Sequence, residues 1–549
     1  MKKILFAAII LFIVIYILPL GYKPAIIPDE TRYAEIPREM LQSGDWIVPK
    51  FNGLRYFEKP VMAYWANAVS MKIFGQNEFA MRFPSALSVG ISALLIFLAA
   101  AKFSGSRARG VLSAAVFLTC QEVFFVGTFN VMDSMLTMFL NAALFSFYYA
   151  YTEIKYKRFA FLCLFGAFCG LAFLTKGFLA FVLPVATIVP FLLWEKRWKL
   201  LFRLPWLPLI MVLAVSLPWC VSIHFREGDF WNYFVWVEHI KRFIDSNNEF
   251  QHPEPFWFFV PVLLLGALPW TFLFPAAFLG FRKTDLKDSF TRYLLCWFLL
   301  GFLFFSASNG KLATYILPCF APLSILLSAW LIRYFEGGFR KTFDITAIIM
   351  ASIFGIGGLL FLINQATGFP VTAFSKAETW KWIVGIIAFW SWCSLLFLSF
   401  KASDYRKKLA LFCAAPFVLM FVSHFILPDQ VKERKAPGDF LMRHAPMINK
   451  DTIIVSYKNI IGAVNWYYKR DDVYLVMEKG ELEYGFSYKD SMHRFISVED
   501  LNRLIRENSG KKPVVLIIRS KIYNEDCKNN LPKPAYEKTE LEFTFAEYK

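Results

Sequence analysis

Charged side chains crowd two short segments that follow the first apolar run of the chain. The first is Pro28-Asp29-Glu30-Thr31-Arg32-Tyr33-Ala34-Glu35-Ile36, and the second is Tyr56-Phe57-Glu58-Lys59-Pro60. Cations bind phosphate and carboxylates stabilise a positively polarised carbon, so this mixture suits a phosphorylated substrate. The alternative is a solvated loop whose charges pair with one another, an arrangement that contributes little stability.

A further carboxylate, Asp133, stands in Phe129-Asn130-Val131-Met132-Asp133-Ser134, a very short turn between two apolar stretches. One interpretation is a helix N-cap, a position that Asp favours. The other is a carboxylate held rigidly at a membrane surface. The two interpretations are compatible with each other.

Cations recur in two other segments. Glu238-His239-Ile240-Lys241-Arg242-Phe243 carries three of them, and Ser308-Asn309-Gly310-Lys311 is followed one turn later by Tyr315. Contact with lipid headgroups would explain such residues, since Lys, Arg and Tyr favour membrane interfaces. Cations from three separate loops fit a phosphate-binding site better. Glu58 and His239 are also candidate metal ligands, although two ligands alone are a weak metal signal.

Nucleotide-binding motifs are absent from the sequence. It has no P-loop, no glycine-rich turn after a strand, and no Asp-x-Asp pair for a metal-bound nucleotide diphosphate. We therefore expect no nucleotide cofactor, and a substrate that brings its own activated bond.

The composition requires these segments to be positioned by membrane-spanning helices. Of the 549 residues, 57% are hydrophobic and only 18% are charged. A soluble protein keeps roughly 25% of its residues charged, so a soluble enzyme, a disordered protein and a fibre are excluded. The net charge of +17 is expected on loops that face the cytoplasm rather than in a nucleic-acid site.

Thirteen stretches approach the length of about 20 apolar residues that a spanning helix needs. The first lacks a small-residue cleavage site, which predicts a retained anchor rather than a signal peptide. The chain is therefore predicted to be a polytopic α-helical membrane protein. The spans are expected near 4–21, 80–101, 110–127, 134–152, 159–175, 177–194, 204–223, 256–281, 292–308, 312–332, 344–363, 380–400 and 409–427.

The connecting segments predict the orientation. One set, counted with Arg292 at its edge, contains 23 Lys and Arg against six Asp and Glu. Short basic loops face the cytoplasm, so the N-terminus is predicted to be cytoplasmic and the polar C-terminal segment periplasmic. The basic set is 1–3, 102–109, 153–158, 195–203, 282–291, 333–343 and 401–408.

We divide the chain into a transmembrane domain at 1–428 and a small periplasmic α/β domain at 429–549. The transmembrane domain is expected to carry its chemistry on the outside loops 22–79, 128–134, 224–255 and 306–314. Amphipathic patterns predict surface helices at Arg32–Leu41 and Val61–Ile73. The C-terminal segment has buried-strand patterns at Thr452–Tyr457, Val473–Met477 and Val514–Ile518 and a capped-helix pattern at Ser497–Glu507.

The two first-loop segments, the run Gly310-Lys311-Leu312-Ala313-Thr314-Tyr315-Ile316-Leu317-Pro318 and the outward C-terminal domain resemble the bacterial aminoarabinose transferases of lipid A. These enzymes belong to the membrane glycosyltransferase class that includes the protein O-mannosyltransferases. The resemblance covers the whole chain, and the first-loop motif is specific to the family. It implies that 4-amino-4-deoxy-L-arabinose passes from undecaprenyl phosphate to a lipid A phosphate at the periplasmic face of the inner membrane, which confers resistance to polymyxin.

The resemblance also implies roles for single residues. Asp29 matches the essential first-loop carboxylate of the family and Asp133 its second acidic residue, so both are expected to be catalytic, with Glu30 and Arg32 as further first-loop candidates. Groups expected at the donor phosphate are Lys59, Arg242 or its neighbour Lys241, Lys311 and Tyr315. Glu58 and His239 match residues around a bound divalent metal such as zinc.

Two alternatives stay open from the sequence. Within the enzyme class, the chain would move another sugar from a polyprenyl phosphate to a protein or glycan. From another class, it would be a lipid transporter or flippase. Transporters bury ionisable residues within their spans and show repeated halves, whereas the charges here lie in outside loops and no repeat is visible.

Overall fold

The computed structural model describes residues 2–241, 253–368 and 373–549, which form two compact units. The helical unit joins Met1–Leu20 with Phe83–Ile426. The mixed unit joins Gly21–Arg82 with Leu427–Lys549. The first loop and the C-terminal segment, which are far apart in the sequence, therefore belong to one compact unit.

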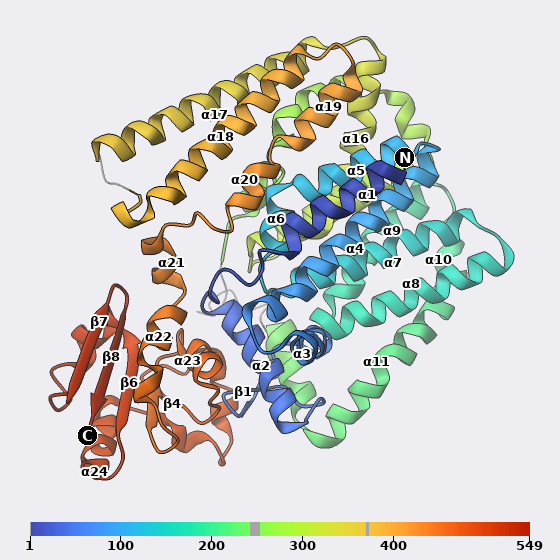
Figure 1. The fold of residues 1–549 in the computed structure, drawn as a ribbon. Coiled ribbons are helices and arrows are strands. Elements are labelled where there is room, and N and C mark those ends of the chain that lie inside the picture. Colours follow the sequence, from blue (N-terminus) through green and yellow to red (C-terminus); the bar gives the residue numbers. More distant parts are fainter. Residues whose placement is uncertain (1, 242–252, 369–372) are drawn as a thin grey trace. The chain divides into compact units, whose positions relative to one another are not determined.

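Seven helices in the described part of the chain are long and apolar enough to cross a membrane (Figure 1). Two further pairs of helices pass the same test together, but each pair is bent, so the number of spans rises to nine if each pair is one span. The seven are α4 (Glu78–Ser104), α8 (Lys155–Lys176), α10 with α11 (Leu200–Arg226), α15 (Ser289–Ala307), η6 with α16 (Ala313–Glu336), α17 (Lys341–Thr367) and η7 with α18 (Lys376–Lys401).

The two bent pairs have identifiable causes. Helix α5 (Arg107–Thr119) meets α6 (Gln121–Gly127) at 68°, because Cys120 between them adopts an extended conformation with ψ of 133°. The segment Phe256–Gly266 meets Trp270–Gly280 at 93°, and Pro269 stands at that break. Proline lacks the N–H that would continue a helix. The Gln121 N–H donates to the Leu268 carbonyl over 3.0 Å, so the two bends meet.

Further helices complete the helical unit. They include the α-helix α7, which begins at Asp133, and the π-helix η2 in the second long loop. Their bounds are α1 (Lys2–Phe12), η1 (Ile13–Ile17), α7 (Asp133–Thr152), α9 (Leu179–Trp194), η2 (Asn232–Lys241), α13 (Phe259–Gly266), α14 (Phe274–Gly280), η5 (Lys283–Lys287), α19 (Tyr405–Ala414) and α20 (Phe417–Val422).

Glycines allow some of these helices to approach closely. A Cβ atom on Gly280 of α14 would lie 2.0 Å from the Trp330 carbonyl oxygen of α16. A Cβ atom on Gly166 of α8 would lie 2.3 Å from the Pro208 carbonyl oxygen of α11. Small residues at such contacts are typical of helices packed within a membrane, where dispersion contacts replace the hydrophobic effect.

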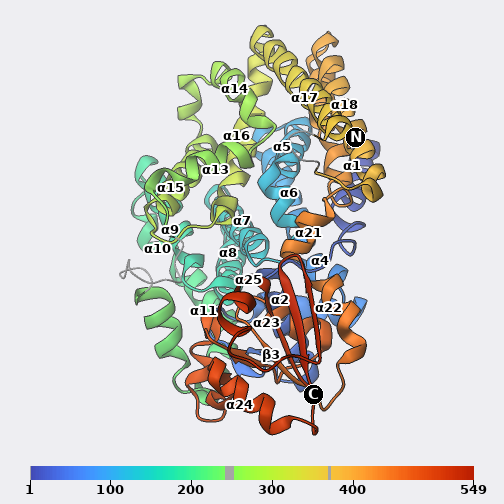
Figure 2. The same ribbon diagram turned by 90° about the vertical axis from the view of Figure 1, so that its left-hand side faces the viewer.

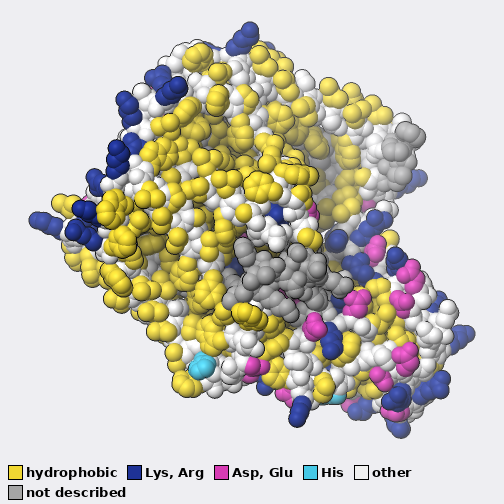
Figure 3. All heavy atoms as spheres, turned by 180° about the vertical axis from the view of Figure 1, so that it is seen from behind, with side chains coloured by type: hydrophobic (Ala, Val, Ile, Leu, Met, Phe, Trp, Pro, Cys, Tyr) yellow, Lys and Arg dark blue, Asp and Glu magenta, His cyan; other side chains and the backbone are white. Residues whose placement is uncertain are grey.

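The outer surface of the helical unit is apolar. Large hydrophobic side chains such as Phe202, Trp206, Phe225 and Ile356 are exposed. Figure 3 shows hydrophobic side chains spread over the bundle, with Lys and Arg gathered along its border. Exposed apolar surface of this extent needs a membrane to cover it, which agrees with the composition.

The mixed unit contains a six-stranded sheet with the strand order β5-β4-β3-β6-β8-β7. Strands β5, β4, β3 and β6 run parallel to one another, whereas β8 is antiparallel to both β6 and β7. Strand patterns in the sequence predicted three of these strands. The bounds are β3 (Ile453–Ser456), β4 (Tyr474–Val476), β5 (Phe495–Ile496), β6 (Val514–Arg519), β7 (Tyr536–Glu540) and β8 (Phe543–Tyr548).

Two helices flank the strands of this sheet (Figure 2). Helix α24 (Val498–Asn508) is capped by Ser497, whose hydroxyl accepts from the Asp500 N–H over 3.1 Å, as the capping pattern predicted. Its Leu501 and Ile505 are buried in one core with Val514 and Leu516 of β6. Helix α23 is Ile461–Tyr468.

The first loop folds into two helices and a hairpin. Helices α2 (Asp29–Ser43) and α3 (Met62–Phe74) cover the two amphipathic stretches, and β1 (Lys50–Phe51) pairs with β2 (Leu54–Arg55). Asn52 and Gly53 turn the hairpin with positive φ, the usual chemistry of a two-residue turn. The Asn52 amide donates to the Val473 carbonyl over 2.8 Å, which ties the hairpin to the C-terminal segment of the same unit.

Candidate active site

Helix α2 places Asp29 and Arg32 on the same face, one turn apart. Arg32 Nη2 lies 2.6 Å from Asp29 Oδ1, and Arg32 Nη1 also pairs with Glu481 from the C-terminal segment. The side chain of Arg32 is 7% exposed, whereas that of Asp29 is 46% exposed. The first turn of α2 therefore presents a half-exposed carboxylate backed by a buried cation.

Arg32 is surrounded by groups that keep it charged. Burial disfavours its charge, but Glu481, Tyr56, Tyr33 and Asp29 outweigh burial and raise the pKa of the guanidinium. Its carbon Cζ lies 4.7 Å from the centre of the Tyr33 ring. Among the described residues, its buried Nε atom has no hydrogen-bond partner. A permanent positive charge with an unused donor thus lies beside the Asp29 carboxylate.

Glu30, next to Asp29 in the sequence, makes a buried ion pair. Its carboxylate receives Arg82 Nη2 at 2.6 Å and Arg82 Nε at 2.7 Å, and neither side chain is more than 3% exposed. Arg82 also donates to the carbonyls of Lys23 and Pro24. Arg82 of α4 therefore joins the start of α2 to the segment that precedes this helix. The interpretation of this loop as solvated is wrong for Glu30 and Arg32, because both are buried.

Replacing Glu30 by Gln should destabilise the mixed unit by about 3–5 kcal/mol, because Arg82 would be left buried without a counter-charge. The measurement is thermal or denaturant unfolding of the purified full-length protein. The matched control is Glu483→Gln, since Glu483 is exposed and its side chain makes no hydrogen bond or ion pair among the described residues. Equal stability of the two variants would contradict a structural role for Glu30.

The second first-loop segment brings Tyr56, Glu58 and Lys59 together. The Tyr56 hydroxyl donates to Glu58 Oε2 over 2.8 Å, and Lys59 Nζ donates to the Glu58 carbonyl oxygen over 3.0 Å. Burial raises the pKa of Tyr56, so its hydroxyl keeps its proton. The Glu58 carboxylate and the Lys59 ammonium group are therefore each held by a contact within this segment.

In the helical unit, Asp133 lies at the centre of a second polar cluster. Lys176 Nζ at the end of α8 lies 2.6 Å from Asp133 Oδ1, and the Thr314 hydroxyl of η6 donates to Asp133 Oδ2 over 3.1 Å. Lys176 Nζ also lies 4.2 Å from the centre of the Tyr315 ring. Asp133 and Tyr315, two predicted site residues, are thus joined through a lysine that lies between them.

The N-cap interpretation of Asp133 is wrong. The N-cap of α7 is Met132, Asp133 is the first residue of the helix, and its side chain makes no capping hydrogen bond. Both of its carboxylate oxygens are instead directed at other elements. The alternative of a rigidly held carboxylate is the one that agrees with this geometry.

Lys311 precedes this cluster in the chain but has a different contact. Its Nζ donates to the Glu254 carbonyl oxygen over 2.6 Å, and the residue is buried. The pKa of Lys311 is lowered from its usual value, because the effect of burial exceeds the opposite effect of the Glu254 carboxylate. The contact joins the second long loop to the turn before η6.

The remaining predicted cations lie where the structure describes little. His239 and Lys241 belong to η2, and their side chains are outside the described part. Arg242 lies outside the described residues altogether. Among the residues that are described, no group of three or more His, Cys, Asp or Glu side chains is placed to hold a metal ion. Glu58 is thus the one described member of the predicted metal pair.

Sequence reasoning missed four partners of the predicted residues: Lys176, Thr314, Arg82 and Glu481. Lys176 stands in Thr175-Lys176-Gly177 between two apolar helices, on the same predicted side as Asp133. A single lysine in so short a turn was the sequence feature that could have indicated a partner for Asp133. Arg82 and Glu481 gave none, because they pair with residues 52 and 449 positions away.

Comparisons with protein families match both ends of the chain. Residues 1–234 match the dolichyl-phosphate-mannose-protein mannosyltransferase family. Residues 432–547 match the C-terminal domain of the arabinosyl transferase ArnT. The two matches fall on the N-terminal half of the transmembrane region and on the sheet-containing segment.

Curated relatives extend the similarity over the whole length. The chain is 40% identical to the undecaprenyl phosphate-alpha-4-amino-4-deoxy-L-arabinose arabinosyl transferase of Shewanella sediminis, over 98% of this chain and 96% of the relative. It is 37% identical to the transferase of the same name from Aeromonas salmonicida, over 95% and 94%.

A solved structure shares the fold. The crystal structure of ArnT from Cupriavidus metallidurans bound to undecaprenyl phosphate matches with a TM-score of 0.84, covering 100% of this chain and 98% of the other. The sequence identity is 22%, so this comparison supports the membrane glycosyltransferase fold alone.

Proposed function

This chain belongs to the family of undecaprenyl phosphate-4-amino-4-deoxy-L-arabinose arabinosyl transferases, and from this we propose that it is a glycosyltransferase of lipid A. It transfers 4-amino-4-deoxy-L-arabinose from undecaprenyl phosphate to a phosphate group of lipid A at the inner membrane, and this confers resistance to polymyxin. The observation that carries the proposal is the 40% identity over 98% of the chain.

The reaction sets two demands on the site. The glycosidic bond to undecaprenyl phosphate breaks, so the leaving phosphate gains negative charge that cations can stabilise. The sugar carbon gains positive charge, which a carboxylate can stabilise. An acceptor phosphate oxygen is already ionised near neutral pH, so a general base is hardly needed.

The residues supply both kinds of charge. We assign Asp29 and Asp133 to the electropositive sugar, either at its reacting carbon or at its ammonium group. Each carboxylate has a cation at 2.6 Å, Arg32 for Asp29 and Lys176 for Asp133.

We assign the donor phosphate to Lys59, Lys311, Tyr315 and the basic pair Lys241 and Arg242. Support comes from the Lys176–Tyr315 contact, which puts Tyr315 beside Asp133.

A divalent metal would be held by Glu58 together with His239. A carboxylate oxygen is a suitable ligand for zinc, and Glu58 already has its Oε2 fixed by Tyr56. When bound, such an ion would add positive charge near the leaving phosphate. The positive charge of Lys59 is assigned to the same phosphate with or without the ion.

We propose thirteen membrane spans with the N-terminus in the cytoplasm and residues 429–549 in the periplasm. Each predicted stretch coincides with a helix, a bent pair or a pair of short helices in the described chain, which supports this count. The basic loops 102–109, 153–158 and 195–203 support the orientation.

A periplasm-active reporter fused after residue 430 should give a strong signal, because an odd number of spans places that point outside. The same reporter fused after residue 408 should give none, since the loop that precedes the fusion point contains Lys401, Arg406, Lys407 and Lys408. The measurement is the enzymatic activity of alkaline phosphatase fusions in whole cells. The reverse pattern would overturn the orientation.

Lipid A from cells that express the protein should gain the mass of one or two aminopentose units, seen by mass spectrometry against cells that lack it. Synthesis of the undecaprenyl-linked donor must be intact in both strains. A shifted mass on a protein or glycan with unmodified lipid A would favour another acceptor. No shift in any fraction would contradict sugar transfer.

A further inference from the structure

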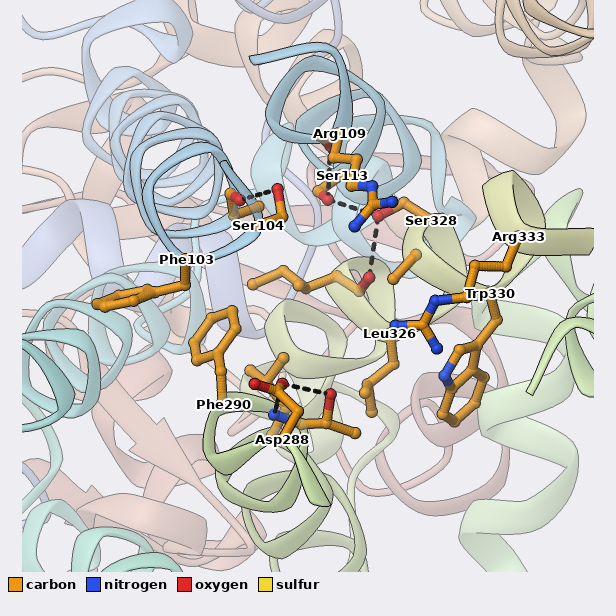
Figure 4. Close-up of a pocket in the computed structure, with 15 residues that line it drawn as sticks. Phe103, Ser104, Arg109, Ser113, Asp288, Phe290, Leu326, Ser328, Trp330 and Arg333 are labelled. Carbon is orange, nitrogen blue, oxygen red and sulfur yellow. Dashed lines mark hydrogen bonds between the residues drawn. The ribbon is translucent and has the colours of Figure 1, made fainter. Parts of the chain in front are cut away.

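A small cavity lies at the end of the helical unit that bears the basic loops. It has a volume of about 220 Å³ and is lined by residues of α4, α5, α15 and α16 (Figure 4). Its polar lining includes Arg109, Arg333, Asp288 and the hydroxyls of Ser113 and Ser328, and its apolar lining includes Phe103, Phe290, Leu326 and Trp330. None of these residues belongs to the candidate active site.

Hydrogen bonds and close packing fix the walls of this cavity. The Ser113 and Ser328 hydroxyl oxygens lie 2.6 Å apart, which joins α5 to α16. A Cβ atom on Gly110 would lie 2.7 Å from the Phe97 carbonyl oxygen, so α5 packs tightly on α4 next to Arg109. The cavity is therefore a built feature of the fold rather than a gap between loosely packed helices.

The two acidic groups around the cavity already have partners. Asp288 caps α15, accepting from the Thr291 N–H and hydroxyl over 2.8 Å each. Asp285, which precedes it, pairs with Arg333. These contacts account for both carboxylates and for one of the two arginines.

Arg109 is the second of the two arginines that line the cavity. Within the described chain its guanidinium makes no ion pair or hydrogen bond, and Figure 4 shows it directed toward the cavity from α5. It lies in the first turn of α5, where the helix dipole is positive and where Arg107 adds a second cation. A negative charge in the cavity would relieve this accumulation of positive charge.

We propose that this cavity binds the phosphate group of an anionic phospholipid. Basic pockets between transmembrane helices are suited to such headgroups. The volume is below the roughly 300–1,000 Å³ of pockets for drug-sized ligands, which suits a phosphate with part of its glycerol. The aromatic and aliphatic lining offers apolar contact to the start of an acyl chain. A free phosphate ion shares the same chemistry and is separated from the lipid by experiment.

The test is native mass spectrometry of the detergent-purified full-length protein titrated with phosphatidylglycerol or with phosphatidylcholine of the same chains. The wild type should bind one phosphatidylglycerol more tightly than phosphatidylcholine. Arg109→Gln should weaken phosphatidylglycerol binding roughly tenfold, since a hydrogen-bonded charge pair is lost. The matched control is Arg107→Gln, which removes an equal charge from an exposed residue of the same helical turn that does not line the cavity.

Each result decides for or against the site. Equal losses in Arg109→Gln and Arg107→Gln, or equal binding of the two lipids by the wild type, would overturn it. Displacement of the lipid by millimolar inorganic phosphate would replace the lipid by a free anion as the occupant. If Arg109→Gln does not fold, Arg109→Lys keeps the charge but loses the two-pronged contact, and a loss smaller than tenfold but larger than that of Arg107→Gln is expected.

Discussion

Replacing Asp29 by Asn should lower turnover about a thousandfold while donor affinity stays within a few-fold of the wild type. The substitution keeps the shape of the side chain and removes its charge. A loss of this size corresponds to about 4 kcal/mol of transition-state stabilisation, which suits a carboxylate that acts on a cationic sugar. An interaction made only in the transition state lowers turnover and leaves ground-state binding intact. The measurement is sugar transfer by the purified enzyme under saturating donor, together with donor binding.

The control for Asp29→Asn is Asp45→Asn in the same loop. Asp45 accepts from the Ile47 and Val48 N–H groups, contacts that an Asn side chain can also make. Turnover of this control should be close to that of the wild type. If Asp29 only pairs with Arg32, Asp29→Asn should unfold more easily and yet turn over normally once folded. That result would remove Asp29 from the mechanism.

The first loop shows how far sequence reasoning reaches. Spacing and amphipathic pattern predicted the helices at Arg32–Leu41 and Val61–Ile73, because both signals are local. The pattern could not show that Glu30 is buried, since the cation that compensates it, Arg82, lies 52 residues away. Nor could it show that Glu481 reaches Arg32, because that contact depends on the packing of the whole mixed unit.

The transmembrane region was predictable for a different reason. Hydropathy depends on composition, so the apolar stretches were visible although their geometry was not. The stretch 110–127 is one apolar run in sequence, yet Cys120 divides it into helices that meet at 68°. No local sequence pattern predicted the bend at Cys120. At the other bent pair Pro269 did provide one, since proline interrupts helices.

Asp133→Asn should lower turnover by about a hundredfold or more and also destabilise the fold, because Lys176 would lose its counter-charge. Both side chains are nearly buried, with 11% of Asp133 and 12% of Lys176 exposed. Removing one partner of such a pair costs about 3 kcal/mol. The measurements are sugar transfer by the purified enzyme and its thermal unfolding. A variant with normal turnover and normal stability would contradict both roles of Asp133.

Activity and stability can be separated by a second substitution at the same place. The double variant Asp133→Asn/Lys176→Met leaves no unpaired charge, so the free energy of unfolding should recover most of what Asp133→Asn loses. If Asp133 acts on the sugar, turnover should stay as low in the double variant as in Asp133→Asn, because the carboxylate is still missing. If the pair only joins α7, α8 and η6, turnover should recover together with stability. Lys176 packs on Tyr315, which we assign to the donor phosphate. The single variant Lys176→Met should therefore weaken donor binding as well.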